Sequence, residues 1–197
     1  MRECLSYNDV LLLPQYSSIR SRSEVNLESR LGNKSYTLPI ISSPMDTITG
    51  TEMALAMEKA GGLGVVHRYC SIAEQIEKIS YEGIRAAAIG VTGDYVDRVA
   101  SLYSAGIRIF CLDVAHGDHS HMEVAIRRIK DTYGEEVHVM AGNVATKEAY
   151  ERLSKWGADS VRIGIGGGSI CSTRIQTGHG MPTFQSVLDC SQSEYDT

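Results

Sequence analysis

The sequence has no excess of basic residues, no long apolar run and no closely spaced cysteine pair. Its 19 Lys and Arg against 24 Asp and Glu leave a formal net charge of -5, which argues against binding to a nucleic-acid backbone. No apolar run approaches the roughly 20 residues that cross a bilayer, and the N-terminus lacks the apolar region of a secretion signal. We therefore expect a cytoplasmic protein that binds neither nucleic acid nor membrane.

The five cysteines are widely scattered, and no two have Cys-x-x-Cys spacing. The pattern therefore indicates neither a zinc site nor a redox dithiol. In a reducing compartment we expect free thiols. Since most free cysteines are buried as small hydrophobic side chains, only its surroundings in the sequence mark one as reactive.

From residue 38 onward the chain repeats a short apolar run, a loop and a segment with helical periodicity. Strands are expected at 38–43, 63–67, 86–90, 108–113, 137–141 and 160–164, and helices at 51–60, 71–80, 95–105, 121–132, 147–156 and 183–190. Strict alternation of strand and helix predicts an α/β fold with a parallel sheet. Polar loops after the strands suit a TIM barrel or a doubly wound sheet.

Residues 1–37 lack this repeat and are expected to form an irregular arm before the domain at 38–197. The domain has about six strand–helix units, whereas a TIM barrel has eight. An open sheet of six strands leaves two unpaired edges and an exposed inner face. We therefore expect a partial barrel that ends before its seventh strand, and a second polypeptide that supplies strands seven and eight.

The glycine-rich stretch 164–180 is the segment most indicative of chemistry. Four of its first five residues are glycine, so its backbone can present N–H groups to an anion or carbonyls to a cation. It is not a P-loop, because no Gly-Lys-Ser/Thr follows, and it lacks the dinucleotide fingerprint. Cys171 stands in this loop close to Arg174, a neighbour of the kind that lowers a thiol pKa and favours a nucleophile. The alternative is a flexible surface loop.

The pattern Gly-x-Gly-x-Gly-Ser-Ile-Cys-x-Thr, followed by Arg and Thr-Gly-x-Gly-x-Pro, is similar to the signature loop of the IMP dehydrogenase/GMP reductase family. Further motifs of that family occur in order at 9–14, 42–47, 61–67, 113–117 and 141–146. One such match would be weak, but six in register along nearly the whole chain are specific. Two positions depart from the pattern: Gly167 replaces the usual Pro or Ser, and Thr183 replaces the usual Gln.

The resemblance implies a TIM-barrel oxidoreductase in which a cysteine attacks C2 of a purine mononucleotide and the adduct exchanges hydride with NAD(H) or NADP(H). Carried over to this sequence, Cys171 is the nucleophile and Thr173 lies in the catalytic loop. Asp113 would bind ribose hydroxyls, and Asn143 would lie near the nucleotide and the nicotinamide.

The resemblance implies further contacts. Ser169 would bind the nucleotide phosphate, and the neighbouring substrate contacts would be Ser43, Met45 and Gly168. A monovalent cation, K+ in particular, would be bound by the backbone carbonyls of Gly166, Gly168 and Cys171. The family's tetramers imply self-association, as a homo- or hetero-oligomer.

The family catalyses two opposite reactions, which leaves the direction open. IMP dehydrogenase oxidises IMP to XMP with NAD, whereas GMP reductase converts GMP to IMP and ammonia with NADPH. The interval from residue 71 to 86 has no room for the tandem CBS insertion of most dehydrogenases. Cys111 and Thr92 match a cysteine and a threonine with which reductases handle the departing ammonia. Both features favour a GMP reductase.

Three alternatives remain. Residues 42–49 and 61–64 read more like a dehydrogenase, so an IMP dehydrogenase without the insertion is the second reading. Cys111 also suits a strand residue packed in a core. An alternative of another class is a non-catalytic fragment that binds a nucleotide or a partner subunit.

Overall fold

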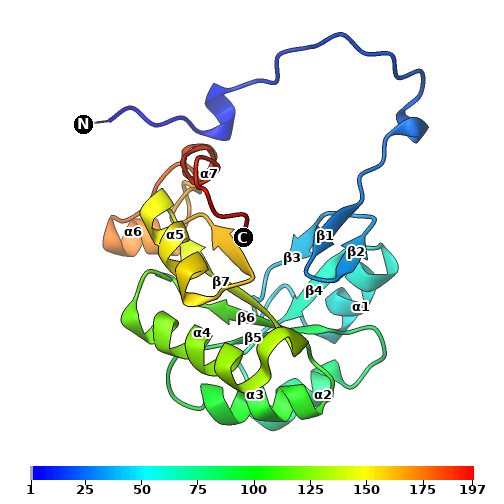
Figure 1. The fold of residues 1–197 in the computed structure, drawn as a ribbon, viewed down its shortest axis with the longest axis vertical. Coiled ribbons are helices and arrows are strands. Elements are labelled where there is room, and N and C mark those ends of the chain that lie inside the picture. Colours follow the sequence, from blue (N-terminus) through cyan, green and yellow to red (C-terminus); the bar gives the residue numbers. More distant parts are fainter. Residues whose placement is uncertain (1) are drawn as a thin grey trace.

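The computed structural model describes residues 2–197 and contains one curled parallel sheet with helices on its outer side (Figure 1). The strands lie in sequence order, each parallel to the next. They are β3 (Ile41–Ser42), β4 (Leu63–Val66), β5 (Ala86–Ile89), β6 (Ile109–Asp113), β7 (His138–Val144) and β8 (Ser160–Ile163). Sequential parallel order with outer helices is the arrangement of a (β/α)8 barrel, so the predicted incomplete TIM barrel is confirmed.

Six of the helices follow the strands and cover the outer face of the sheet (Figure 1). They are α1 (Thr51–Lys59), α2 (Ile72–Ile79), α3 (Tyr95–Ser104), α4 (Ser120–Tyr133), α5 (Lys147–Trp156) and α7 (Thr183–Cys190). Each lies within one residue of its predicted bounds. At the start of α2, the Ser71 hydroxyl and the Glu74 carboxylate each accept a backbone N–H of the other residue, which forms a capping box.

Apolar side chains pack against both faces of the sheet. On β6, Phe110 and Leu112 point outward into the layer beneath the helices, whereas Ile109 and Cys111 point into the concave inner layer. This alternation follows from the two-residue period of a strand, and burial on both faces is typical of parallel sheets. In the part of the chain that the structure describes, no helix has the length and apolar character of a membrane span.

A β-hairpin closes the N-terminal ends of the strands. It consists of β1 (Ser29–Leu31) and β2 (Lys34–Tyr36), which pair in antiparallel fashion. Gly32 in its turn has φ +58°, and a Cβ there would lie 2.9 Å from His138 Nδ1, so the turn packs directly on β7. Tyr36 and Leu31 join the inner apolar layer. The hairpin lies within the segment expected to be irregular, and its three-residue strands are too short to show periodicity.

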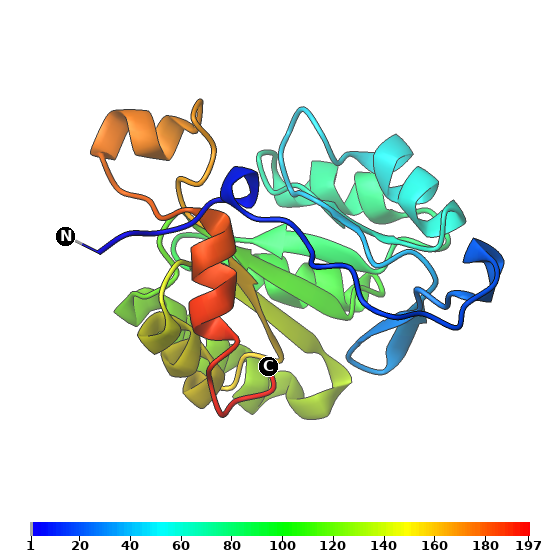
Figure 2. The same cartoon turned by 90° about the horizontal axis from the view of Figure 1, so that it is seen from above.

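The segment before the hairpin bridges the two edges of the sheet. Its first residues are fastened to α7: the Leu5 N–H donates to Gln185 Oε1, and the Gln185 N–H donates to Leu5 O. From there the chain crosses to the hairpin beside β3 (Figure 2). It contains two short 3-10 turns and exposes Leu11 and Leu12 almost fully, at 99% and 98%.

Candidate active site

A cavity of about 430 Å³ opens at the C-terminal ends of β4, β6, β7 and β8. In parallel α/β folds this is the end of the sheet at which ligands bind. The lining residues come from the strand ends and the glycine-rich loop and are Arg68, Tyr69, Asp113, Val114, Ala115, Asn143, Arg162, Gly164, Ile165, Gly166, Cys171 and Thr173. Asp113 is the one acidic side chain among them, against two arginines.

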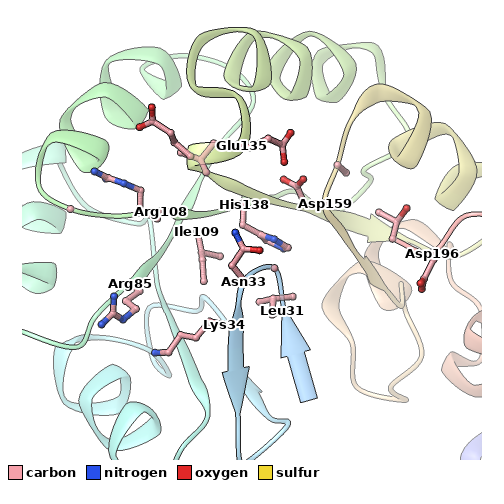
Figure 3. A pocket seen from close by; sticks show the side chains of 16 residues that line it. Leu31, Asn33, Lys34, Arg85, Arg108, Ile109, Glu135, His138, Asp159 and Asp196 are labelled. Carbon is pink, nitrogen blue, oxygen red and sulfur yellow. The ribbon is translucent and has the colours of Figure 1, made fainter. Parts of the chain in front are cut away.

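A larger cavity of about 760 Å³ lies at the opposite end, between the hairpin and the strand N-termini (Figure 3). Several of its charged groups serve the fold: Lys34 pairs with Glu58 at 2.9 Å, and Asp159 pairs with Lys130 at 3.0 Å. The Arg108 guanidinium donates to two backbone carbonyls. In barrels of this type the N-terminal end contributes to stability, so we place the candidate site in the smaller cavity.

Cys171 lies in the loop after β8, at the N-cap of a short helix, α6 (Ser172–Thr177), that the sequence analysis did not predict. The nearby backbone N–H of Arg174, helped by Thr173 and Gly166, lowers the pKa of the Cys171 thiol below its ordinary value. Backbone dipoles at the start of α6 therefore act on the sulfur, where the sequence had suggested the charge of the arginine side chain. A partly exposed thiol of lowered pKa is the arrangement of a nucleophile.

The loop that carries Cys171 is closed at its base by backbone contacts. Gly166 has φ +64°, and a Cβ there would lie 2.6 Å from His179 O and 2.7 Å from Gly180 Cα. The Met181 N–H donates to Ile165 O at 2.9 Å. Only glycine combines this backbone conformation with such a close approach, so Gly166 holds the two ends of the loop together.

The three carbonyls expected to bind a monovalent cation do not form an open set of ligands. The Gly168 carbonyl accepts the Cys171 N–H at 3.1 Å, and the Cys171 carbonyl accepts the Ile175 N–H at 3.0 Å. A Cβ on Gly180 would lie 3.0 Å from the Gly166 carbonyl, which is therefore crowded. The loop's own hydrogen bonds thus use one lone pair on two of these carbonyls, and the K+ site stays a prediction to which we assign no chemistry.

Asp113 ends β6 and forms an ion pair inside the cavity. Arg162 Nη1 lies 2.6 Å from Asp113 Oδ1 and also donates to Cys111 Sγ at 3.3 Å. From the other side, Arg68 Nη2 donates to the Asp113 backbone carbonyl at 3.1 Å. Within residues 2–197 no hydrogen bond reaches Asp113 Oδ2, so this oxygen is available to a ligand.

Cys111 itself is fully buried beneath the cavity. It has no exposed surface, and burial raises the pKa of its thiol to about 11. It therefore stays protonated at neutral pH and is linked to the cavity through Arg162 rather than by lining it.

Asn143 joins β7 to the glycine-rich loop. Its side-chain Nδ2 donates to the Gly164 carbonyl at 2.8 Å, and its backbone N–H donates to Val114 O at 2.9 Å. These bonds hold the amide beside Asp113 and Cys171 in the cavity lining.

Some of the residues named from the sequence line this cavity, and others lie outside its lining. The cavity is lined by Cys171, Thr173, Asp113, Asn143 and Gly166. The named residues outside its lining are Ser43, Met45, Thr92, Gly168 and Ser169, all exposed in loops, together with the buried Cys111.

Sequence reasoning missed Arg68 and Arg162. Arg162 lies inside a short strand between two apolar residues, and Arg68 stands two residues after the end of another strand. A charged side chain at such a position is costly to bury unless it is paired, and this signal could have identified both.

The fold and the cavity together define a TIM-barrel-type domain with a thiol of lowered pKa and a carboxylate at the C-terminal ends of its strands. A family model described as "IMP dehydrogenase / GMP reductase domain" matches residues 4–197. The chain therefore belongs to the IMP dehydrogenase/GMP reductase family, whose members are oxidoreductases, as the sequence had indicated.

Some of the individual relatives are named GMP reductase, and others are named inosine-5'-monophosphate dehydrogenase. The chain is 34% identical to GMP reductase 1 of Mus musculus over 202 residues, which cover 97% of this chain and 58% of that protein. It is 32% identical to an inosine-5'-monophosphate dehydrogenase of Borreliella burgdorferi over 243 residues, 95% of this chain and 60% of that protein. A dehydrogenase of Nitrosopumilus maritimus is 25% identical over 320 residues. The chain thus spans about three fifths of the length of the first two of these relatives.

Proposed function

We propose that this chain is the thiol-bearing part of a GMP reductase, which converts GMP to IMP and ammonia at the expense of NADPH. The observation that carries the proposal is the Cys171 thiol, whose pKa is lowered, in one cavity with the carboxylate of Asp113. A covalent step needs a thiolate near neutral pH, and among the five cysteines Cys171 alone lines this cavity.

In the proposed reaction, the Cys171 thiolate adds to C2 of GMP, and the 2-amino group leaves as ammonia after gaining a proton. A bound dihydronicotinamide would supply the hydride for C2 and would leave as the oxidised nicotinamide. Expulsion of the Cys171 thiolate then releases IMP. The free Asp113 Oδ2 fits the hydroxyls of a ribose, because an ionised carboxylate accepts hydrogen bonds from two donors. Thr173 and Asn143 flank the thiol and position the purine.

Further substrate contacts are proposed from the exposed loops at the same end of the sheet. Ser43 and Met45 follow β3, while Gly168 and Ser169 precede the nucleophile. Ser169 makes no side-chain hydrogen bond within residues 2–197, so its hydroxyl is free to meet a phosphate. Thr92 and Cys111 act at the release of ammonia, Cys111 through its contact with Arg162.

The short link between α2 and β5 supports the reductase over the dehydrogenase. α2 and β5 are joined directly by residues 80–85, which leaves no room for an inserted domain. The alignment that covers 97% of this chain is 202 residues long with the mouse reductase and 320 residues long with the Nitrosopumilus dehydrogenase. The longer alignment means that the dehydrogenase has additional residues where this chain has none. The second candidate, an IMP dehydrogenase that lacks the insertion and uses NAD, is supported by the 32% identity to the Borreliella protein.

Activity requires the rest of the barrel, either in the same polypeptide or in a second one. β3 and β8 are the two edges of the sheet, and open edges of parallel strands seek a partner. The nearly complete exposure of Leu11 and Leu12 in the bridging segment supports the same requirement. We place the completed enzyme in the cytoplasm as an oligomer.

The deciding experiment assays the completed enzyme with GMP and NADPH, and separately with IMP and NAD, by following the nicotinamide absorbance. Turnover is expected with the first pair, and Cys171→Ala should abolish it. Cys4→Ala, a cysteine substitution outside the cavity lining, serves as the matched control. Retained turnover in Cys171→Ala would refute the nucleophile. Turnover with IMP and NAD alone would establish the dehydrogenase, and nucleotide binding without turnover would favour a non-catalytic binding role.

A further inference from the structure

Three residues on adjacent strands form one row, and the outer two of them line the cavity. Asp113 on β6 pairs in register with Gly142 on β7, and Gly142 pairs in register with Arg162 on β8. The ion pair between Arg162 and Asp113 therefore spans two strand spacings, about 10 Å between backbones. To reach Asp113 Oδ1 at 2.6 Å, the arginine side chain has to pass over the middle strand.

Gly142 makes this crossing possible. A Cβ at position 142 would lie 2.7 Å from Arg162 Cβ and 2.8 Å from Arg162 O, closer than real Cβ atoms approach other atoms. Both contacts involve atoms next to the backbone, so the clash could not be relieved by a rotamer change. Any side chain at this position would push β8 away and withdraw the guanidinium.

The pair leaves Asp113 with one oxygen held and one oxygen free. Arg162 Nη1 uses its two hydrogens on Asp113 Oδ1 and Cys111 Sγ, and no hydrogen bond within residues 2–197 reaches Asp113 Oδ2. The Arg162 and Asp113 side chains are 24% and 18% exposed, so water only partly screens the pair. The other charged group facing Asp113 is Arg68, which binds its backbone carbonyl and leaves the carboxylate rotamer unrestrained.

We propose that Arg162, admitted by Gly142, is a positioning residue that fixes the Asp113 carboxylate so that Oδ2 faces the vicinal diol of a ribose. The inference rests on the proposed function, in which Asp113 receives ribose hydroxyls, and adds the residues that orient it. The diol belongs either to the purine nucleotide or to the nicotinamide nucleotide. Both offer the same pair of hydroxyl donors.

The test measures how strongly the completed enzyme prefers a ligand with a diol over the same ligand without it. Binding of GMP is compared with that of 2',3'-dideoxy-GMP by calorimetry, and binding of NADPH with that of an analogue lacking the nicotinamide ribose hydroxyls. Hydrogen bonds to a charged group correspond to a preference of about tenfold to a hundredfold. The pair that shows this preference in the unaltered enzyme identifies the source of the diol.

Arg162→Met should reduce that preference to about twofold or less, since the free carboxylate then rotates. Arg162→Lys should restore part of it, and Arg128→Met, an exposed charge removed from α4, should leave it unchanged. Equal weakening of the diol and dideoxy ligands in Arg162→Met would show a merely structural role and overturn the proposal. So would an unchanged preference.

Gly142→Ala should reproduce the effect of Arg162→Met, and adding it to Arg162→Met should cause no further loss of preference. An additive loss in the double variant would overturn the role of Gly142. Because binding is measured directly, the ratio is informative even without turnover. Failure of the proposed reaction, seen as absent turnover in the unaltered enzyme, is thereby distinguishable from failure of the positioning role.

Discussion

Gly167 and Thr183 occupy adjoining space at the base of the loop that carries Cys171. A Cβ on Gly167 would overlap the Thr183 hydroxyl oxygen and lie 3.3 Å from its Cβ. These are the two positions at which the sequence departs from the family's signature loop, where Pro or Ser and then Gln are usual. The two departures therefore belong to one packing arrangement, because the absence of a side chain at Gly167 leaves space that the Thr183 side chain fills.

Gly167→Ser is expected to disturb the loop, because its new side chain meets Thr183. Thr183→Gly in the same chain should remove the clash and recover much of the loss. For residues in contact we expect a coupling of about 1–2 kcal/mol in a double-mutant cycle, read from unfolding in urea and from turnover. Thr183→Gly alone is the control. Strictly additive effects would show that the two departures are independent.

Cys171 should be the cysteine most readily alkylated in the native protein. Because the pKa of its thiol is lowered, its reaction rate with iodoacetamide should level off at a lower pH than the ordinary thiol value of about 8.5. Burial raises the pKa of Cys111 and of Cys190 to about 11, so both should stay unmodified. Mass spectrometry of timed samples across pH 6–10 measures each site. A midpoint for Cys171 above the ordinary value would contradict the lowered pKa of its thiol.

Gln75 is a polar core residue whose loss should destabilise the fold. It is fully buried, its Nε2 donates to the carbonyls of Ala88 and His67, and its Oε1 accepts from Arg98 Nη1 at 2.7 Å. Gln75→Leu leaves these buried partners unpaired, so we expect a loss of about 2–4 kcal/mol in the free energy of unfolding, although leucine is more apolar.

Urea unfolding measures this loss. Glu77→Ala on the exposed side of the same helix is the matched control, with an expected change within about 0.5 kcal/mol. A Gln75→Leu variant as stable as the unaltered protein would mean that water satisfies the orphaned groups.

The sequence was sufficient for the repeating elements of this fold but not for its shortest ones. The strands and outer helices bury a periodic apolar face, as Phe110 and Leu112 do on β6, and periodicity is visible in a single sequence. The hairpin at Ser29–Tyr36 and the helix at Ser172–Thr177 are too short to show a period. Both are held in place by tertiary contacts, such as that of Gly32 with His138.

The candidate site likewise contains residues that could be named from the sequence and contacts that could not. Cys171 and Asp113 could be named from local motifs, because each stands in a distinctive stretch of sequence. Arg162 stands out locally as a charged residue within a strand, but its partner could not be named, since Asp113 lies 49 positions away on a strand that is not its neighbour. This pairing follows only from the register of three strands and from the fact that the residue between the two partners, Gly142, has no side chain. Contacts of this kind depend on how the sheet is assembled, which no local pattern encodes.

The packing of the hairpin on His138 should make the fold sensitive to mild acid. Burial lowers the pKa of the His138 imidazole below the ordinary value of 6.5, and its Nε2 is hydrogen-bonded to Ser160 Oγ at 2.8 Å. The unfolded chain therefore binds a proton more readily than the folded one, so stability is complete above pH 6.5 and falls as the pH drops below it. This group can contribute a slope of at most about 1.4 kcal/mol per pH unit.

Burial also lowers the pKa of His67, so His138→Gln should reduce the loss of stability between pH 7.5 and 5.5 without abolishing it. Urea unfolding at the two pH values measures the difference in the free energy of unfolding, and His116→Gln is the control. An unchanged pH dependence in His138→Gln would show that the hairpin contact does not respond to this histidine.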